Sequence, residues 1–114
     1  MKLVIIMVIV KYKRITLIKN LTYMILRQEI GNRFKKIRDT HNLNQAEFSR
    51  FLSEGIANDE KISRPTIIKI ESGINLPSFK VLNLLIKQCN IRLNWLFTGE
   101  GGNEIVVDFS SWEL

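Results

Sequence analysis

The chain has 114 residues, enough for one domain with a single modest core. Seventeen Lys and Arg against eleven Asp and Glu give a net charge of +6, a basic balance that fits a polyanionic partner. One cysteine, Cys89, excludes an internal disulfide, and a single histidine beside it makes a Cys/His metal site implausible. We therefore expect a cytoplasmic protein without a metal or cofactor.

The charges divide the chain into three parts. Residues 1–23 carry five bases and no acid, residues 24–102 carry twelve bases and eight acids, and residues 103–114 carry three acids and no base. We interpret these parts as an apolar, basic N-terminal extension, a central domain and an acidic C-terminal tail. The central domain is only mildly basic, so its charge permits binding to nucleic acid without requiring it.

An apolar run at residues 3–10 follows Lys2 and imitates the first two regions of a signal peptide. No small-residue cleavage site follows it, and eight residues are too few to cross a bilayer as a helix, so no membrane partner is expected. Its β-branched residues favour a short strand, paired with residues 14–18. A second interpretation is that residues 1–23 are not natural coding sequence and that translation begins at Met24.

After residue 25 the apolar residues recur at helical spacing. Ile30, Phe34 and Ile37 predict a first helix from about residue 26 to residue 41. Four shorter helical segments follow, each with a cap or stop signal. They are "LNQAEFSRFL" with Asn44 as N-cap, "SRPTIIKIESG" between Ser63 and Gly73, a segment capped by Ser78 after the turn "NLPS", and "IRLNWLF" before Gly99.

The remaining segments lack helical periodicity. Residues 53–61 form a predicted loop, and residues 105–109 are at most a short strand. The predicted fold class is all-α, a compact five-helix domain with a short β segment at the N-terminus.

The segment that begins at Ser63 has one apolar face and one polar face. At about 100° per residue, Ile67, Ile70 and Ile74 fall on one side, whereas Pro65 and Lys69 fall opposite. A short helix with a basic outer face, placed directly after another short helix, suits the DNA major groove, which admits one α-helix.

Residues from about 30 to 102 resemble the phage-repressor-like, Cro/CI-type helix-turn-helix regulators, also called the XRE family. The resemblance rests on "LNQAEFSRFL", "ISRPTIIKIESG", "NLPSFKVLNLLIKQCNI" and "NWLFTGEG", which occur in one order and frame. It implies a lambda-repressor-like domain that binds operator DNA, usually as a dimer.

The resemblance also implies residue roles. Gln45 would hold a phosphate and brace the base-reading side chains, and Asn75 would grip another phosphate. Arg38 and Glu71 would form a structural ion pair between the first helix and the recognition helix. The implied DNA-binding residues are Gln45, Ser63, Arg64, Pro65, Thr66, Ile68, Lys69 and Asn75.

Two features depart from the family pattern. Nine residues, 53–61, stand where the family's turn has about one, and their net charge of −2 predicts a loop beside the recognition helix that bulges away from DNA. Ile68 stands where a polar residue is more usual, so it either touches a thymine methyl or covers apolar atoms of the loop.

The sequence therefore predicts a sequence-specific DNA-binding regulator, a repressor that acts as a homodimer. One alternative is an antitoxin that binds its operator and also a toxin partner, and another is a protein-interaction module on the same fold. An enzyme is not expected, because the sequence has no Ser/His/Asp set, no motif of paired carboxylates and no phosphate-binding glycine loop.

Overall fold

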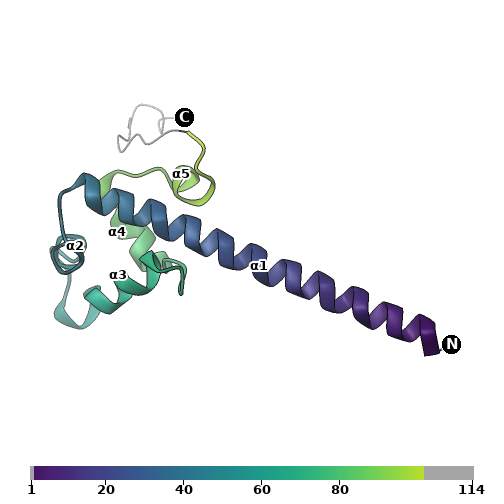
Figure 1. The fold of residues 1–114 in the computed structure, drawn as a ribbon. Helices are drawn as coiled ribbons and strands as arrows, with labels where there is room; N and C mark the ends of the chain where they lie inside the picture. The colour runs from purple at the N-terminus through teal and green to yellow at the C-terminus, as the bar shows by residue number, and fades with distance from the viewer. Residues whose placement is uncertain (1, 102–114) are drawn as a thin grey trace, which may run out of the picture.

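The computed structural model describes residues 2–101, and within this range every element is helical (Figure 1). The predicted all-α class is confirmed. The acidic tail, with the strand considered at residues 105–109, lies outside the described range. The elements are α1 (Lys2–Thr40), α2 (Gln45–Leu52), the 3₁₀ helix η1 (Asn58–Glu60), α3 (Arg64–Glu71), α4 (Phe79–Cys89) and α5 (Leu93–Thr98).

The N-terminal extension is not a strand, so that prediction is wrong. Residues 2–40 form one continuous helix of 39 residues, whose first half projects away from the other helices (Figure 1). The predicted first helix from about residue 26 is the part of α1 that packs on the domain. Two reasons explain the helix. Extending an existing helix needs no further nucleation step, and within the described residues there is no strand with which the β-branched run could pair.

The core lies between the second half of α1 and the four shorter helices. Phe34 of α1 and Phe48 of α2 meet edge to face, with ring centroids 5.5 Å apart and an interplanar angle of 77°. Trp95 is also buried. The other buried side chains of the core are Ile30, Ile37, Leu52, Ile62, Ile67, Ile70, Val81, Leu84, Leu85, Cys89, Ile91 and Leu96.

Ile74 is the one residue of the predicted apolar face of the third helix that the structure places in solvent. Its side chain is 63% exposed, whereas Ile67 and Ile70 are fully buried. The reason is Gly73, which has φ +77° and turns the chain away from the helix axis before Ile74 is reached.

Side chains fix the helix ends. The Asn44 carboxamide oxygen accepts from the Glu47 backbone N–H at 2.8 Å, and the Asn44 backbone N–H donates to the Glu47 carboxylate at 3.0 Å, forming a capping box at α2. The Ser78 hydroxyl accepts from the Val81 backbone N–H at the start of α4. These caps hold the first turns of α2 and α4 in place.

The nine-residue insertion is closed at its base and contains η1. The backbone N–H of Ile62 donates to the Ser53 hydroxyl at 2.8 Å, and both residues are buried. Ile56 packs against the core, and with Glu60 it lines a shallow depression completed by Phe79 and neighbouring residues of α4. The insertion therefore packs on the start of α4.

Candidate nucleic-acid interface

The platform for α3 is the second half of α1. Gly31 lies directly under the end of α3, where an added Cβ would overlap the carbonyl oxygen of Ile70 and come within 2.9 Å of that of Glu71. Only glycine permits this close approach. A few residues earlier on α1, the Arg27 guanidinium donates to the carbonyl oxygen of Gly73 at 3.2 Å. Both contacts fix the C-terminal end of α3, so its N-terminal end is the free one.

A buried charge network joins α1, α2 and α3. Arg38 donates two hydrogen bonds to the Glu71 carboxylate, from Nε to Oε2 at 2.7 Å and from Nη2 to Oε1 at 2.9 Å. Its third donor, Nη1, reaches the carbonyl oxygen of Leu43 at 2.9 Å. The two charged side chains are only 11% and 6% exposed. The hydrogen bonds to Glu71 raise the pKa of Arg38, so the guanidinium stays charged.

Gln45 extends this network to the surface. Its side-chain amide donates to Oε1 of Glu71 at 3.3 Å from the first position of α2. Arg38 and Gln45 also line a polar surface depression with Asn44, Ala46 and Arg64. The depression therefore lies where the starts of α2 and α3 approach each other.

A second depression lies on the other side of the α3 start. Its lining residues come from the first turns of α3 and from the turn that leads to α4: Ser63, Pro65, Thr66, Lys69, Ile70, Asn75, Leu76 and Ser78. Of the eight residues predicted to bind DNA, seven line one or other of these two depressions. The eighth, Ile68, is 38% exposed on α3.

The start of α3 is open to solvent. Arg64, Pro65 and Lys69 are exposed, and Thr66 is half-buried. The hydroxyl groups of Ser63 and Thr66 lie 3.0 Å apart, and Ser63 makes no side-chain bond to a backbone N–H of the helix. The first turn of α3 thus combines the partial positive charge of a helix N-terminus with two exposed bases nearby, an arrangement that attracts phosphate.

Three residues that position the interface were not identified from the sequence. Arg27 and Gly31 hold α3, and Arg33 donates from Nη1 to the carbonyl oxygen of Leu96 at 2.8 Å, which fixes α5 on α1. The one signal in the sequence was Gly31, a glycine within an otherwise helical run. Glycine destabilises the interior of a helix, so its presence there indicates a close contact that a larger residue would prevent.

The comparison with protein families agrees with this geometry. A family model described as a helix-turn-helix domain matches residues 31–102, which include α2, α3, α4, α5 and the residues that line both depressions. The chain therefore belongs to the helix-turn-helix domain family, a class of DNA-binding domains typical of transcription regulators. Searches of curated proteins and of solved structures gave no significant match. Within the described residues, no helix is both long enough and apolar enough to cross a membrane.

Proposed function

We propose that the protein is a sequence-specific transcriptional repressor of the Cro/CI (XRE) type, with residues 24–102 as the DNA-binding domain. The observation that carries the proposal is the clustering of the candidate DNA-binding residues around the exposed start of α3. In this proposal α3 enters the major groove with its N-terminal end first, which is the end left free by its contacts with α1.

The roles of the side chains follow from their positions. Arg64 and Lys69 reach base edges or the adjacent phosphates, and Pro65 and Thr66 lie against the groove. Gln45 donates to a phosphate while Glu71 keeps its amide in place, which couples the position of α2 to that of α3. Asn75 contacts a phosphate from the turn after α3, and Ile68 contacts a thymine methyl.

The test is the binding of K69A to DNA. Sites are first selected from random DNA with the unaltered protein, and K69A should then lose about 1–3 kcal/mol of binding free energy at the preferred site and relax the base preference at one position. K87A is the matched control, because Lys87 is also exposed but lies on α4 and lines neither depression. Equal weakening of K69A on all sequences would assign Lys69 to a phosphate, and unchanged binding would contradict the proposed orientation of α3.

An antitoxin would use the same DNA-binding face and add a toxin as partner. DNA binding does not separate this alternative from a simple repressor. Co-expression with the product of a neighbouring gene does, because only an antitoxin relieves the toxicity of its partner.

A further inference from the structure

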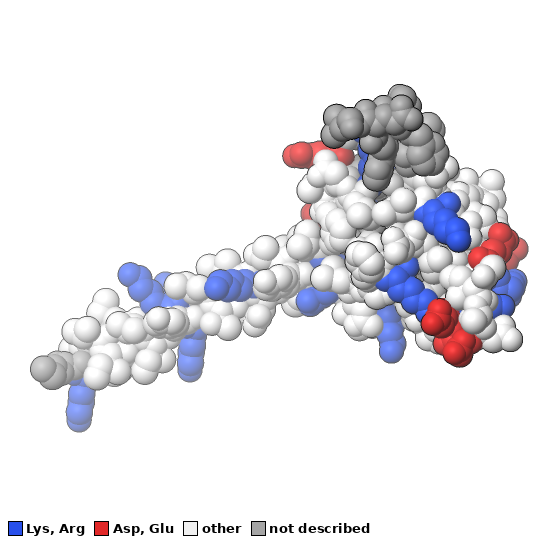
Figure 2. Space-filling model, turned by 180° about the vertical axis from the view of Figure 1, so that it is seen from behind, with Lys and Arg blue, Asp and Glu red and all other residues white. Residues whose placement is uncertain are grey.

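The projecting half of α1, residues 2–26, carries most of the large apolar side chains that are exposed on the described part of the chain. Seventeen of its side chains are large, apolar and exposed, with exposed fractions from 37% to 76%. Monomeric proteins rarely leave such a continuous apolar surface in water, so this half of α1 has the character of an interface. It carries five bases and no acid up to Met24, and Figure 2 shows its basic side chains spaced along its length.

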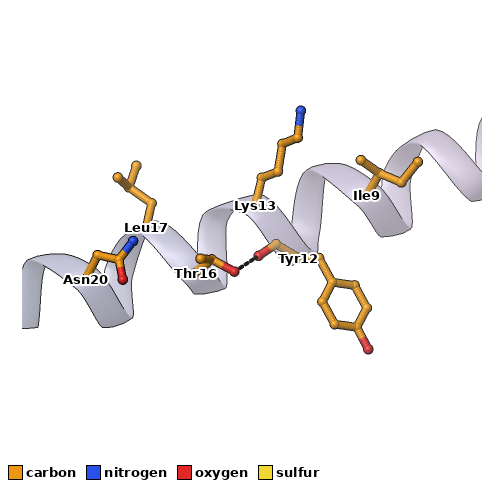
Figure 3. Close-up of a pocket in the computed structure, with 6 residues that line it drawn as sticks. All are labelled: Ile9, Tyr12, Lys13, Thr16, Leu17 and Asn20. Atoms are coloured by element: carbon orange, nitrogen blue, oxygen red, sulfur yellow. Dashed lines mark hydrogen bonds between the residues drawn. The ribbon is translucent and has the colours of Figure 1, made fainter.

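One face of the projecting helix has the spacing of a coiled-coil seam. Leu3, Val10, Leu17 and Met24 recur every seven residues, and a second row interleaves with them at offsets of three and four. Figure 3 shows that Leu17 points away from the side occupied by Tyr12, so the seam is distinct from the face that carries Tyr12. The interleaved row is Met7, Arg14 and Leu21. Six of these seven seam positions are therefore apolar, and Arg14 is the exception.

We infer that this seam pairs with the same seam of a second copy of the chain in an antiparallel coiled coil. Arg14 decides the direction. A parallel, in-register pair would place Arg14 against Arg14 of the other copy, two like charges in the centre of the seam. An antiparallel pair places Arg14 against Leu17 of the other copy, where its long aliphatic stem covers apolar surface and its charged end reaches water.

The flanking charges select the register. When Arg14 lies opposite Leu17, Met7 lies opposite Met24, and the residues beside the seam meet as Lys13 with Asn20 and Lys11 with Ile18. No base then lies opposite another base. Sliding one helix by a heptad in either direction places Lys13 opposite Lys13 or opposite Arg27, which is repulsive. One antiparallel register therefore satisfies both the apolar seam and the charges.

The area of the seam is sufficient for a specific dimer. The six apolar seam side chains of each copy are exposed at 44–76%. At roughly 100 Å² for each side chain that becomes buried, the two copies together remove about 1,200 Å² from water, the lower bound of stable protein interfaces, before the flanking residues are counted. The pairing is thus expected to be reversible at micromolar concentrations.

The first test compares two substitutions on adjacent faces of the full-length protein. L17K places a charge in the seam, whereas I15K places the same charge outside it, and both side chains are exposed on the same helix at 59% and 50%. The oligomeric state is measured by sedimentation velocity at protein concentrations from about 1 to about 100 μM, the range in which an interface of this size should associate. The unaltered protein and I15K should form dimers, and L17K should remain monomeric. A monomeric unaltered protein, or equal effects of the two substitutions, would overturn the inference.

The second test determines the direction by disulfide cross-linking. M7C and M24C place single thiols on the seam, and the native Cys89 does not compete, because it is buried and its burial raises its pKa to about 12. An equimolar mixture of the two variants should cross-link on mild oxidation, whereas neither variant alone should. Cross-linking of M7C with itself would overturn the antiparallel arrangement.

A vesicle experiment separates the other class of partner. If the unaltered protein is monomeric and sediments with vesicles that contain phosphatidylserine, the apolar basic helix binds anionic lipid and the dimer is refuted. The sedimentation, cross-linking and vesicle experiments contain no DNA. A negative result in them therefore says nothing about the DNA-binding test of K69A, and a negative result in that test says nothing about the dimer.

Discussion

Gly31 is the residue that most directly sets the position of α3, because it brings two carbonyl groups at the end of α3 against the backbone of α1. G31A should raise the helix propensity of α1 by up to about 1 kcal/mol. The added Cβ nevertheless overlaps backbone, which cannot rotate away as a side chain can, and overpacking of this kind costs about 1–3 kcal/mol. We expect a net loss of stability in urea unfolding and a larger loss of DNA binding, because α3 must move. N32A, on the exposed side of the same turn, should change stability by no more than about 0.5 kcal/mol; a G31A protein more stable than the original would show that α1 and α3 separate at no cost.

Removing one partner of the ion pair between Arg38 and Glu71 should destabilise the fold by more than the intact pair contributes to stability. E71A leaves the Arg38 guanidinium buried, charged and without its two strongest acceptors, so we expect a loss of about 3–5 kcal/mol in the free energy of unfolding. Thermal melting measures it, and E47A, which removes an exposed capping interaction, is expected to cost only about 1 kcal/mol. An unchanged melting temperature for E71A would mean that water replaces the carboxylate.

At the scale of elements, local signals were sufficient where a helix carries its own boundaries. Asn44 and Ser78 cap α2 and α4 as predicted, and Gly73 and Gly99 end α3 and α5 with left-handed backbone. The start of α1 has no such signal. The β-branched run at residues 4–10 has strand propensity, but propensity is weak against the continuation of a helix already formed downstream. The close approach at Gly31 depends on two elements far apart in the sequence, which no local pattern reveals.

The insertion at residues 53–61 should be dispensable for the fold. Its ends are joined by the hydrogen bond from Ile62 to Ser53, so replacing residues 54–61 by a single glycine needs little rearrangement. The loss of the partly buried Ile56 is offset in part by closure entropy, about 0.6 kcal/mol for each halving of the loop, and we expect a net change within about 2 kcal/mol in thermal unfolding.

The same shortened protein should bind random DNA more tightly at low salt, because the deletion removes a net charge of −2 from the DNA-binding domain. A protein that keeps the full loop but carries D59N and E60Q separates charge from length and should show the same gain. If the shortened protein stays folded but loses binding to its preferred site, the insertion is itself a contact element.

At the scale of the whole molecule, the projecting half of α1 and the domain should be separable. Every residue from 2 to 26 is exposed, and the side-chain hydrogen bonds of Thr16 and Thr22 stay within the helix, so a protein that starts at Met24 should unfold at the same temperature as the full chain. It should still recognise one half-site with the same dependence on Lys69. On a site with two half-sites, however, its affinity should fall by roughly 10²–10⁴, because two linked domains bind with an effective concentration that separate ones lack. A gel-shift titration on single and paired half-sites measures both quantities. Equal affinity of the truncated and full-length proteins for the paired site would show that the two domains are linked by a surface other than α1, whereas a lower melting temperature would show that the projecting helix supports the domain directly.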